Sequence, residues 1–360
     1  MFGMSEAPKD PSPFDPSAAA RPDSGIFGLD DSEEAARVVL VPVPFDATTS
    51  YHRGTAAGPQ AILAASHQVD LFDVQTGRPY AAGIHLQPES PQVLAWNQTA
   101  RAAADPVIAA AGVISGSDAA TLSAQLLQVN QISQQLELWV TTQAERLLQA
   151  GKLVGIVGGD HSVPLGAIKA HAQHYPGLGI LHIDAHADLR CAYEGFTQSH
   201  ASIMYNVMTQ VPQVARLVQV GLRDVCEEEV DFIKDSGGRI TAFFDFDLAS
   251  ARADGEPWRK TCARIASELP PLVYVSFDID GFERALCPHT GTPVPGGLLY
   301  NDVLLLLAEI VRSGRRIVGF DLTEVAPSPD PDNDWDANVG ARILYKLIGF
   351  ALQSATPAST

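Results

Sequence analysis

The sequence predicts an α/β protein, a three-layer α/β/α domain built on a parallel β-sheet. Between residues 153 and 322, short apolar runs alternate with helical patterns, as expected of parallel strands joined by helices. The predicted strands are apolar throughout, which is typical of a sheet covered on both faces. Histidine and acidic residues follow several strands directly, where open α/β sheets bind their ligands. A (β/α)8 barrel fits the same alternation and is the alternative architecture.

The first part of the chain is predicted to hold an arm, one strand and two helices. Residues 1–36 are rich in Pro, Ser, Asp and Ala, which predicts a mobile arm or a peripheral wrap. The apolar run 38–43 predicts a buried strand, and Pro59 suits the first turn of a short helix. Apolar residues at three- and four-residue steps predict a long helix over 118–150. Residues 76–118 have weak periodicity, so we expect loops and short pieces there.

The remaining elements complete one predicted catalytic domain over residues 37–360. Another loop is expected at 245–257. Six predicted strands and six predicted helices alternate along residues 153–352. The strands are 153–157, 178–183, 217–220, 240–244, 273–277 and 317–322. The helices are 163–174, 200–209, 227–236, 258–268, 301–313 and 337–352.

Composition and charge restrict the class of partner. The formal net charge is -18, from 42 acidic and 24 basic residues, so the surface repels phosphate backbones and no nucleic acid is expected. No apolar stretch approaches the roughly 20 residues of a membrane span, and no basic segment precedes an apolar core. We therefore expect a cytoplasmic protein without a membrane partner, whose charge suits a small cationic substrate.

Three runs at strand ends supply six candidate metal ligands. Oxygen and imidazole nitrogen are the ligands that divalent cations such as Mn²⁺ take, and one carboxylate can bridge two cations. The same cluster without metal would be costly, because buried charges need partners. The ligands are His161, Asp184, His186, Asp188, Asp278 and Asp280. They predict two divalent cations that together activate a water molecule for attack on an electron-poor carbon or phosphorus.

Two further residues are candidates for catalysis and substrate binding. His200, in Ser199-His200-Ala201-Ser202, can shuttle a proton, because histidine titrates near neutrality. The alternative is a histidine that only packs at a helix start. Glu324 follows a strand and can bind a guanidinium or amidinium group through both oxygens. The alternative for Glu324 is a salt bridge to a neighbouring arginine.

Taken together, these residues resemble the ureohydrolase superfamily, which includes arginases, agmatinases, guanidino-acid hydrolases and formimidoylglutamases. The resemblance covers about residues 37–352. The matching segments are GGDHS at 158–162, DAHAD at 184–188, SHAS at 199–202, SFDID at 276–280, TGTPVPGG at 290–297, DLTEVAP at 321–327 and WDANVGARILYKL at 335–347.

The resemblance implies a three-layer α/β/α domain with two Mn²⁺ ions, or Ni²⁺ in some members, in trimers or hexamers. It also implies that Asp188 orients the attacking hydroxide, His200 relays protons and Glu324 holds the guanidinium, with urea and an amine or ammonia as products. The implied ligands are His161, Asp184, Asp188 and Asp278 for one cation, and His186, Asp184, Asp278 and Asp280 for the other.

Departures from the family pattern bear on the substrate. Arg190 stands where arginases usually have Asn, and Phe282-Glu283-Arg284 replaces a common Leu-Asp-Pro, which counts against L-arginine. Segments 195–204 and 335–340 resemble the nickel-dependent guanidine hydrolases, whose close relatives act on N-alkylated guanidines or dimethylbiguanide (metformin). We therefore expect a small guanidine compound as substrate. Agmatinase and guanidinobutyrase activities are the alternatives.

Two other classes of protein share parts of this pattern. A non-catalytic subunit could partner an active paralogue, but such subunits usually lose ligands, and here all six are present together with His200 and Glu324. A zinc deacetylase or a phosphatase also uses Asp-x-Asp and histidine ligands. The segments 321–327 and 290–297 count against both.

Overall fold

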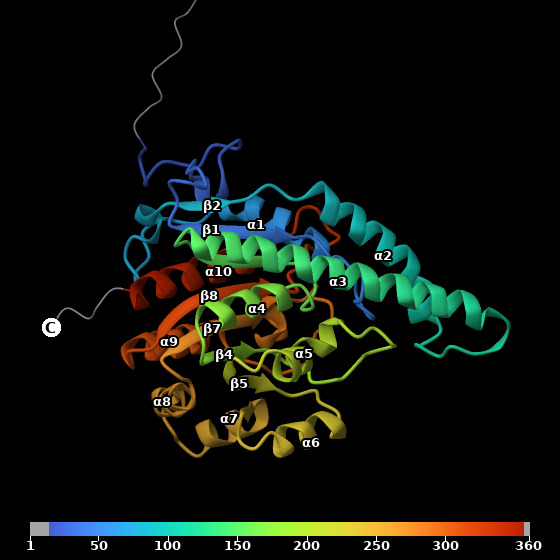
Figure 1. Cartoon of the computed structure of the whole chain (residues 1–360). Coiled ribbons are helices and arrows are strands. Elements are labelled where there is room, and N and C mark those ends of the chain that lie inside the picture. The colour runs from blue at the N-terminus through green and yellow to red at the C-terminus, as the bar shows by residue number, and fades with distance from the viewer. Residues whose placement is uncertain (1–13, 356–360) are drawn as a thin grey trace, which may run out of the picture.

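Eight parallel strands form the centre of the structure, a computed structural model that describes residues 14–355 (Figure 1). Their order is β2-β1-β3-β8-β7-β4-β5-β6, and every neighbouring pair is parallel. The sheet is open, with β2 and β6 at its edges, so the three-layer prediction is confirmed and the barrel is excluded. The strands are β1 Val38–Val43, β2 Ile84–Leu86, β3 Leu153–Gly158, β4 Leu178–Ile183, β5 Val214–Leu222, β6 Ile240–Phe244, β7 Leu272–Asp278 and β8 Arg316–Thr323.

Helices cover both faces of the sheet because successive strand residues bury opposite faces. In β1, Val38 and Leu40 join one apolar core, whereas Val39 and Val41 join the other. The first core contains α1, α8, α9 and α10, and the second contains residues of α2, α3 and α4. A third core includes residues of α4 and α5. The helices are α1 Gly58–Ser66, α2 Pro91–Ala109, α3 Ala119–Gln149, α4 Leu165–His174, α5 Ile203–Gln210, α6 Glu227–Asp235, α7 Asp245–Ala253, α8 Trp258–Glu268, α9 Tyr300–Arg312 and α10 Trp335–Ser354.

Two segments that were expected to be loops contain regular structure. Residues 76–118 hold the edge strand β2 and the 19-residue helix α2, and residues 245–257 begin with α7. The buried face of α2 is made largely of small side chains, among them Ala100, Ala103 and Ala104. Alanine on both faces of a helix gives little hydrophobic contrast, so the periodicity of α2 was too weak to read from sequence.

The described part of the N-terminal arm packs on α1 and α10. Ile26 and Phe27 are buried and belong to the first core. The Phe27 ring lies 4.7 Å from the ring of Tyr345 in α10, and its N–H donates to Ser66 Oγ. Residues 1–13, the remainder of the predicted arm, lie outside the described residues.

The four strands that carry candidate site residues are neighbours in the middle of the sheet. In the order β3-β8-β7-β4, their carboxyl ends lead to His161, Glu324, the Asp278–Asp280 pair and Asp184. Residues that are 163 positions apart therefore meet at one edge. Within residues 14–355, no helix is both long and apolar enough to cross a membrane.

Candidate functional site

A first group of ligand atoms surrounds Nδ1 of His161, which follows β3. This nitrogen lies 3.0 Å from Asp184 Oδ2, 3.2 Å from Asp188 Oδ2 and 3.3 Å from Asp278 Oδ2. All four residues are buried. Ligand atoms about 2.1 Å from an octahedral cation lie about 3 Å from one another. The spacing therefore fits a divalent cation held by His161, Asp184, Asp188 and Asp278.

A second group adjoins the first through Asp184. His186 Nδ1 lies 3.4 Å from Asp184 Oδ1 and 3.2 Å from Asp280 Oδ2. Asp184 thus presents Oδ2 to the first group and Oδ1 to the second, which is the arrangement expected of a bridging carboxylate. Asp278 Oδ1 accepts the N–H of Asp280 at 2.8 Å, so this pair is braced by its own backbone. The structure brings together all six ligands predicted from the sequence.

The electrostatics of the cluster also fit a cation pair. Burial, and then the charges of Asp280 and Asp184, raise the pKa of Asp278 well above its usual value. Burial and Asp184 raise the pKa of Asp188 to about 7. Burial opposes a charged His161, but its contacts with Asp184, Asp188 and Asp278 raise its pKa well above normal. The carboxylates therefore need positive charge, which two divalent cations would supply together with Lewis acidity toward water and substrate.

His182 is a site residue that the sequence reasoning missed. It lies in β4 two residues before Asp184, is fully buried, and places Nε2 2.8 Å from Asp184 Oδ2. It groups with His161, Asp184 and Asp188 as a possible metal-binding set. The available signal was a histidine on the same face of an otherwise apolar strand as the first aspartate ligand.

Asp188 and Glu324 hold strained backbone conformations, with φ of 54° and 61°. Residues other than Gly, Asn and Asp seldom adopt a left-handed φ, so Glu324 is the more unusual of the two. Residues in this conformation cluster at functional sites. Glu324 Oε1 accepts the N–H of His161 at 2.9 Å, whereas the buried Oε2 has no hydrogen-bond partner within residues 14–355. Among the described residues, no basic side chain forms an ion pair with Glu324, so the alternative of a salt bridge is not seen. Burial, and then Asp278, raise the pKa of Glu324 well above normal.

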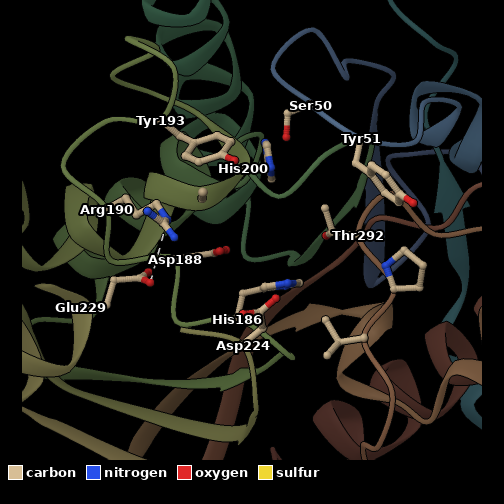
Figure 2. A pocket seen from close by; sticks show the side chains of 13 residues that line it. Ser50, Tyr51, His186, Asp188, Arg190, Tyr193, His200, Asp224, Glu229 and Thr292 are labelled. Carbon is tan, nitrogen blue, oxygen red and sulfur yellow. Dashed lines mark ion pairs between the residues drawn. The ribbon is translucent and has the colours of Figure 1, made fainter. Parts of the chain in front are cut away.

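A cavity of about 330 Å³ opens above His186 and Asp188 (Figure 2). Arg190, Tyr193 and Glu229 lie on one side of it, and Tyr51 and Thr292 lie on the other. Its lining combines carboxylates, imidazoles and aromatic rings with one guanidinium group. The lining residues are Ser50, Tyr51, His186, Asp188, Arg190, Tyr193, His200, Ala201, Asp224, Glu229, Thr292, Pro293 and Val294.

His200 lines this cavity and has a nitrogen available for proton transfer. Its Nδ1 is buried and has no hydrogen-bond partner in the part of the chain that the structure describes, and its backbone N–H donates to Thr48 Oγ1 at 3.2 Å. The Tyr193 ring meets the imidazole edge-on, at a centroid distance of 5.9 Å. Burial, and then the neighbouring His186, lower the pKa of His200 to about 4. The imidazole is therefore neutral at pH 7 and can accept a proton before passing it on.

Arg190 forms the charged part of the cavity wall. Its guanidinium carbon lies 5.2 Å from the centroid of the Tyr193 ring, and its Nε lies 3.9 Å from Glu229 Oε2. The buried Glu229 is fixed by the N–H groups of Leu189 and Cys226, each at 2.9 Å. The sequence identified Arg190 only as a departure from a family pattern. Tyr193 and Glu229 were missed because they come from a loop and from α6, and no spacing connects them.

Comparisons with known proteins agree with the fold. The family model described as the arginase family matches residues 36–349. An N(1)-aminopropylagmatine ureohydrolase of Thermus thermophilus is 32% identical over 327 residues, covering 90% of this chain and 94% of that protein.

Two solved structures share the fold. The proclavaminate amidino hydrolase from Streptomyces clavuligerus superposes with a TM-score of 0.70 at 22% identity, covering 94% of this chain and all of that one. The agmatine ureohydrolase of Thermoplasma volcanium gives 0.66 at 23% identity, covering 90% and 92%.

The enzyme class expected from the sequence, a metal-dependent amidine hydrolase, is confirmed by these matches. The match extends over nearly the whole described chain, including every strand that carries a candidate ligand. This protein belongs to the arginase family.

Proposed function

We propose that this ureohydrolase acts on a small guanidine compound without a charged tail: guanidine itself, or an N-alkylated guanidine or biguanide such as dimethylbiguanide. The reaction adds water across one C–N bond and releases urea, or guanylurea from a biguanide, with ammonia or an amine. The observation that carries the proposal is Arg190, which places a positive charge in the wall of the cavity above the ligand cluster.

The roles of Asp188 and His200 follow from their positions in the cavity lining, whereas Glu324 is not a lining residue and its role rests on its buried, unpartnered oxygen. Two cations, Mn²⁺ or Ni²⁺, would be held by the two ligand groups, since His and Asp ligands accept both metals. Asp188 lies at the cavity floor and takes a proton from the attacking water, and His200 relays a proton to the departing nitrogen. Glu324 offers its unpartnered Oε2 to the N–H groups of the guanidinium.

Arg190 supports a tail-less substrate on electrostatic grounds. Its side chain is 37% exposed, so part of its charge faces the cavity in spite of Glu229. The guanidinium substrate already carries one positive charge, and an aminoalkyl tail lying along this wall would bring a second one against Arg190. N-alkyl groups, in contrast, can contact the apolar surfaces of Tyr51, which lies opposite Arg190, and of the lining residues Pro293 and Val294.

Two alternatives each have a specific observation in their favour. The relative from Thermus thermophilus is named for a guanidino compound with a polyamine tail, and Asp224 at the cavity could receive such an amine. A carboxylate tail, as in 4-guanidinobutyrate, could instead pair with Arg190. The agmatine-type activity therefore depends on Asp224, and the guanidino-acid activity depends on Arg190.

Urea release tests the proposal. Protein loaded separately with Ni²⁺ and Mn²⁺ would be given guanidine, methylguanidine, dimethylbiguanide, agmatine, 4-guanidinobutyrate and L-arginine, with guanylurea measured by chromatography. We expect the highest kcat/KM for one of the first three compounds. A preference for agmatine or 4-guanidinobutyrate would overturn the tail-less assignment, and no product from any compound would favour a non-catalytic subunit.

An Arg190→Gln variant sharpens this test because it removes the charge and keeps a polar side chain. If Arg190 excludes cationic tails, kcat/KM for agmatine rises in the variant; if it binds carboxylate tails, kcat/KM for 4-guanidinobutyrate falls.

Assembly as a trimer or hexamer, with or without a paralogous subunit, and a cytoplasmic location stay predictions. Sedimentation of the purified protein, with and without its paralogue, tests the assembly.

A further inference from the structure

Four buried polar residues form one row across the centre of the sheet, beside the ligand cluster. They are Gln219 in β5, His182 in β4, Ser276 in β7 and Asp321 in β8, and they occupy matching register positions. Each is fully buried. Burying polar groups in a sheet core is unfavourable unless they are hydrogen-bonded, so this row needs a physical explanation. We call it the polar row.

At one end of the polar row, Gln219 fixes the proton position on His182. The Gln219 amide nitrogen lies 2.7 Å from the Ala187 carbonyl oxygen and 2.9 Å from His182 Nδ1. A carbonyl only accepts, so this atom is the amide nitrogen, and its second hydrogen points to Nδ1. A neutral imidazole has one donor and one acceptor nitrogen. The proton of His182 is therefore on Nε2, which donates to Asp184 Oδ2 at 2.8 Å.

The orientation of Gln219 leaves its own oxygen without a partner. Gln219 Oε1 is buried and makes no hydrogen bond among the described residues. An unpaired buried acceptor is unfavourable, because it has lost its hydrogen bonds to water. The fold retains this cost at a position that supplies N–H groups to both Ala187 and His182.

At the other end of the row, Ser276 and Asp321 fix the proton position on His161. Ser276 Oγ donates its only hydrogen to Asp321 Oδ1 at 3.1 Å, and the N–H of Phe277 donates to the same oxygen at 3.1 Å. His161 Nε2 lies 2.9 Å from Ser276 Oγ and must be the donor of that bond. In the neutral ring, the lone pair of His161 is therefore on Nδ1, the nitrogen that faces Asp184, Asp188 and Asp278.

We propose that the polar row is a positioning device that sets the tautomers of two imidazoles in opposite senses. His161 is made to present a lone pair and serve as a ligand. His182, although it lies in the same cluster, is made to present an N–H that orients the bridging carboxylate of Asp184. His182 and Gln219 are thus positioning residues and not ligands. This inference rests on the metal-dependent part of the proposed function and is independent of the substrate.

Mn²⁺ affinity, measured by competition with a chromophoric chelator, tests the proposal. We expect Gln219→Leu to weaken binding about 10–100-fold, the usual effect of losing a residue that orients a ligand. His182→Gln keeps an N–H near the position of Nε2 and should stay within about threefold of wild type. If Gln219 acts through His182, adding Gln219→Leu to His182→Gln has little further effect. Strictly additive losses, or loss of metal in His182→Gln alone, would overturn the proposal.

A matched serine pair tests the other end of the row. Ser276→Ala removes the acceptor of the His161 proton and should weaken Mn²⁺ binding about 10-fold. Ser133→Ala makes the same change at a buried hydroxyl in α3 that has no hydrogen-bond partner among the described residues, and it should leave the affinity unchanged. Thermal unfolding of each metal-free variant controls for general destabilisation. Equal affinities of the two serine variants would contradict a role for Ser276.

The tautomer can also be read on the unmodified protein. Two-bond ¹H–¹⁵N correlation spectra of the metal-free, histidine-labelled chain, with its 10 histidines, show which nitrogen of each ring is protonated. The His182 signals are those that vanish in His182→Gln. A proton on Nε2 is expected, and a proton on Nδ1 would overturn the proposal. Because no substrate is present in these measurements, metal binding as expected without urea release would contradict the proposed function and leave this inference intact.

Discussion

We call the ligand cluster the floor of the cavity, and we call Tyr51, Arg190, Tyr193 and Glu229 its wall. The two regions differ in how firmly their charged groups are held. On the floor, His161 contacts three buried carboxylates at 3.0–3.3 Å and is fixed from behind by the sheet. On the wall, Arg190 is part-exposed, and its nearest carboxylate contact is 3.9 Å, at Glu229. Floor residues follow adjacent strands, whereas wall residues come from loops and α6. The chemistry of this enzyme is therefore built into the sheet, and its selectivity is left to segments that can change independently.

Removing a floor carboxylate has the largest expected effect. Asp278→Ala deletes a carboxylate of the first ligand group that is expected from the family resemblance to bridge both cations, so metal content should fall from two ions per chain and urea release should drop below detection. Asp224→Ala removes a carboxylate that lies beside His186 but belongs to neither ligand group, and it should leave the metal content unaltered. Metal analysis of both purified variants makes the comparison. A normal metal content in Asp278→Ala would remove this residue from the ligand set.

His200 connects floor and wall, and its loss should be smaller in effect. His200→Ala should keep both metals while slowing turnover by about 10²–10⁴, the usual range for a group that transfers protons. The loss should appear in kcat, since the imidazole acts on the reacting atoms. Turnover at the wild-type rate would mean that His200 only packs against Tyr193, which is the alternative left open by the sequence.

Glu324 should show a loss in both substrate binding and turnover. Glu324→Gln preserves the size of the side chain but loses its charge, and we expect kcat/KM to fall about 10²–10³-fold, as for other groups that stabilise charge in the transition state. Metal content should not change, because among the described residues the Glu324 carboxylate accepts a hydrogen bond from the His161 backbone and none from a ligand side chain. If metals are lost instead, Glu324 supports the first ligand group and does not hold the guanidinium.

The same division explains what the sequence could predict. His161, Asp184 and Asp278 are visible because polar residues that end apolar strands of a parallel sheet must meet at one edge. Tyr193 and Glu229 follow from no such rule, because their neighbours are set by loop conformation. α2 was missed because half of its buried residues are alanine, which gives a weak hydrophobic periodicity. His182 was missed because a histidine within an apolar strand does not by itself reveal a contact with a ligand such as Asp184. Local sequence patterns thus predicted the three layers and the candidate ligands, whereas the wall residues could be identified only from the tertiary structure.

The helix missed from sequence supports the wall, and this provides the smallest predicted effect. Buried Asp46 accepts the N–H groups of Gly54 and Ala56 at 3.2 Å, which closes the loop that carries Tyr51. Arg101 of α2 holds Asp46 from the other side, with Nη1 3.2 Å from Oδ1. The Arg101 side chain is 32% exposed, so this pair contributes about 1 kcal/mol at most.

Arg101→Gln should therefore raise KM about fivefold, since 1.4 kcal/mol corresponds to a factor of ten, with kcat and metal content unchanged. Arg146→Gln is the matched control, because Arg146, in α3, pairs with Glu33 of the N-terminal arm and does not line the cavity. Steady-state kinetics with the preferred substrate measures both variants. A fall in kcat in Arg101→Gln would mean that loosening the wall also disturbs the floor, and the two regions could then not be treated as independent.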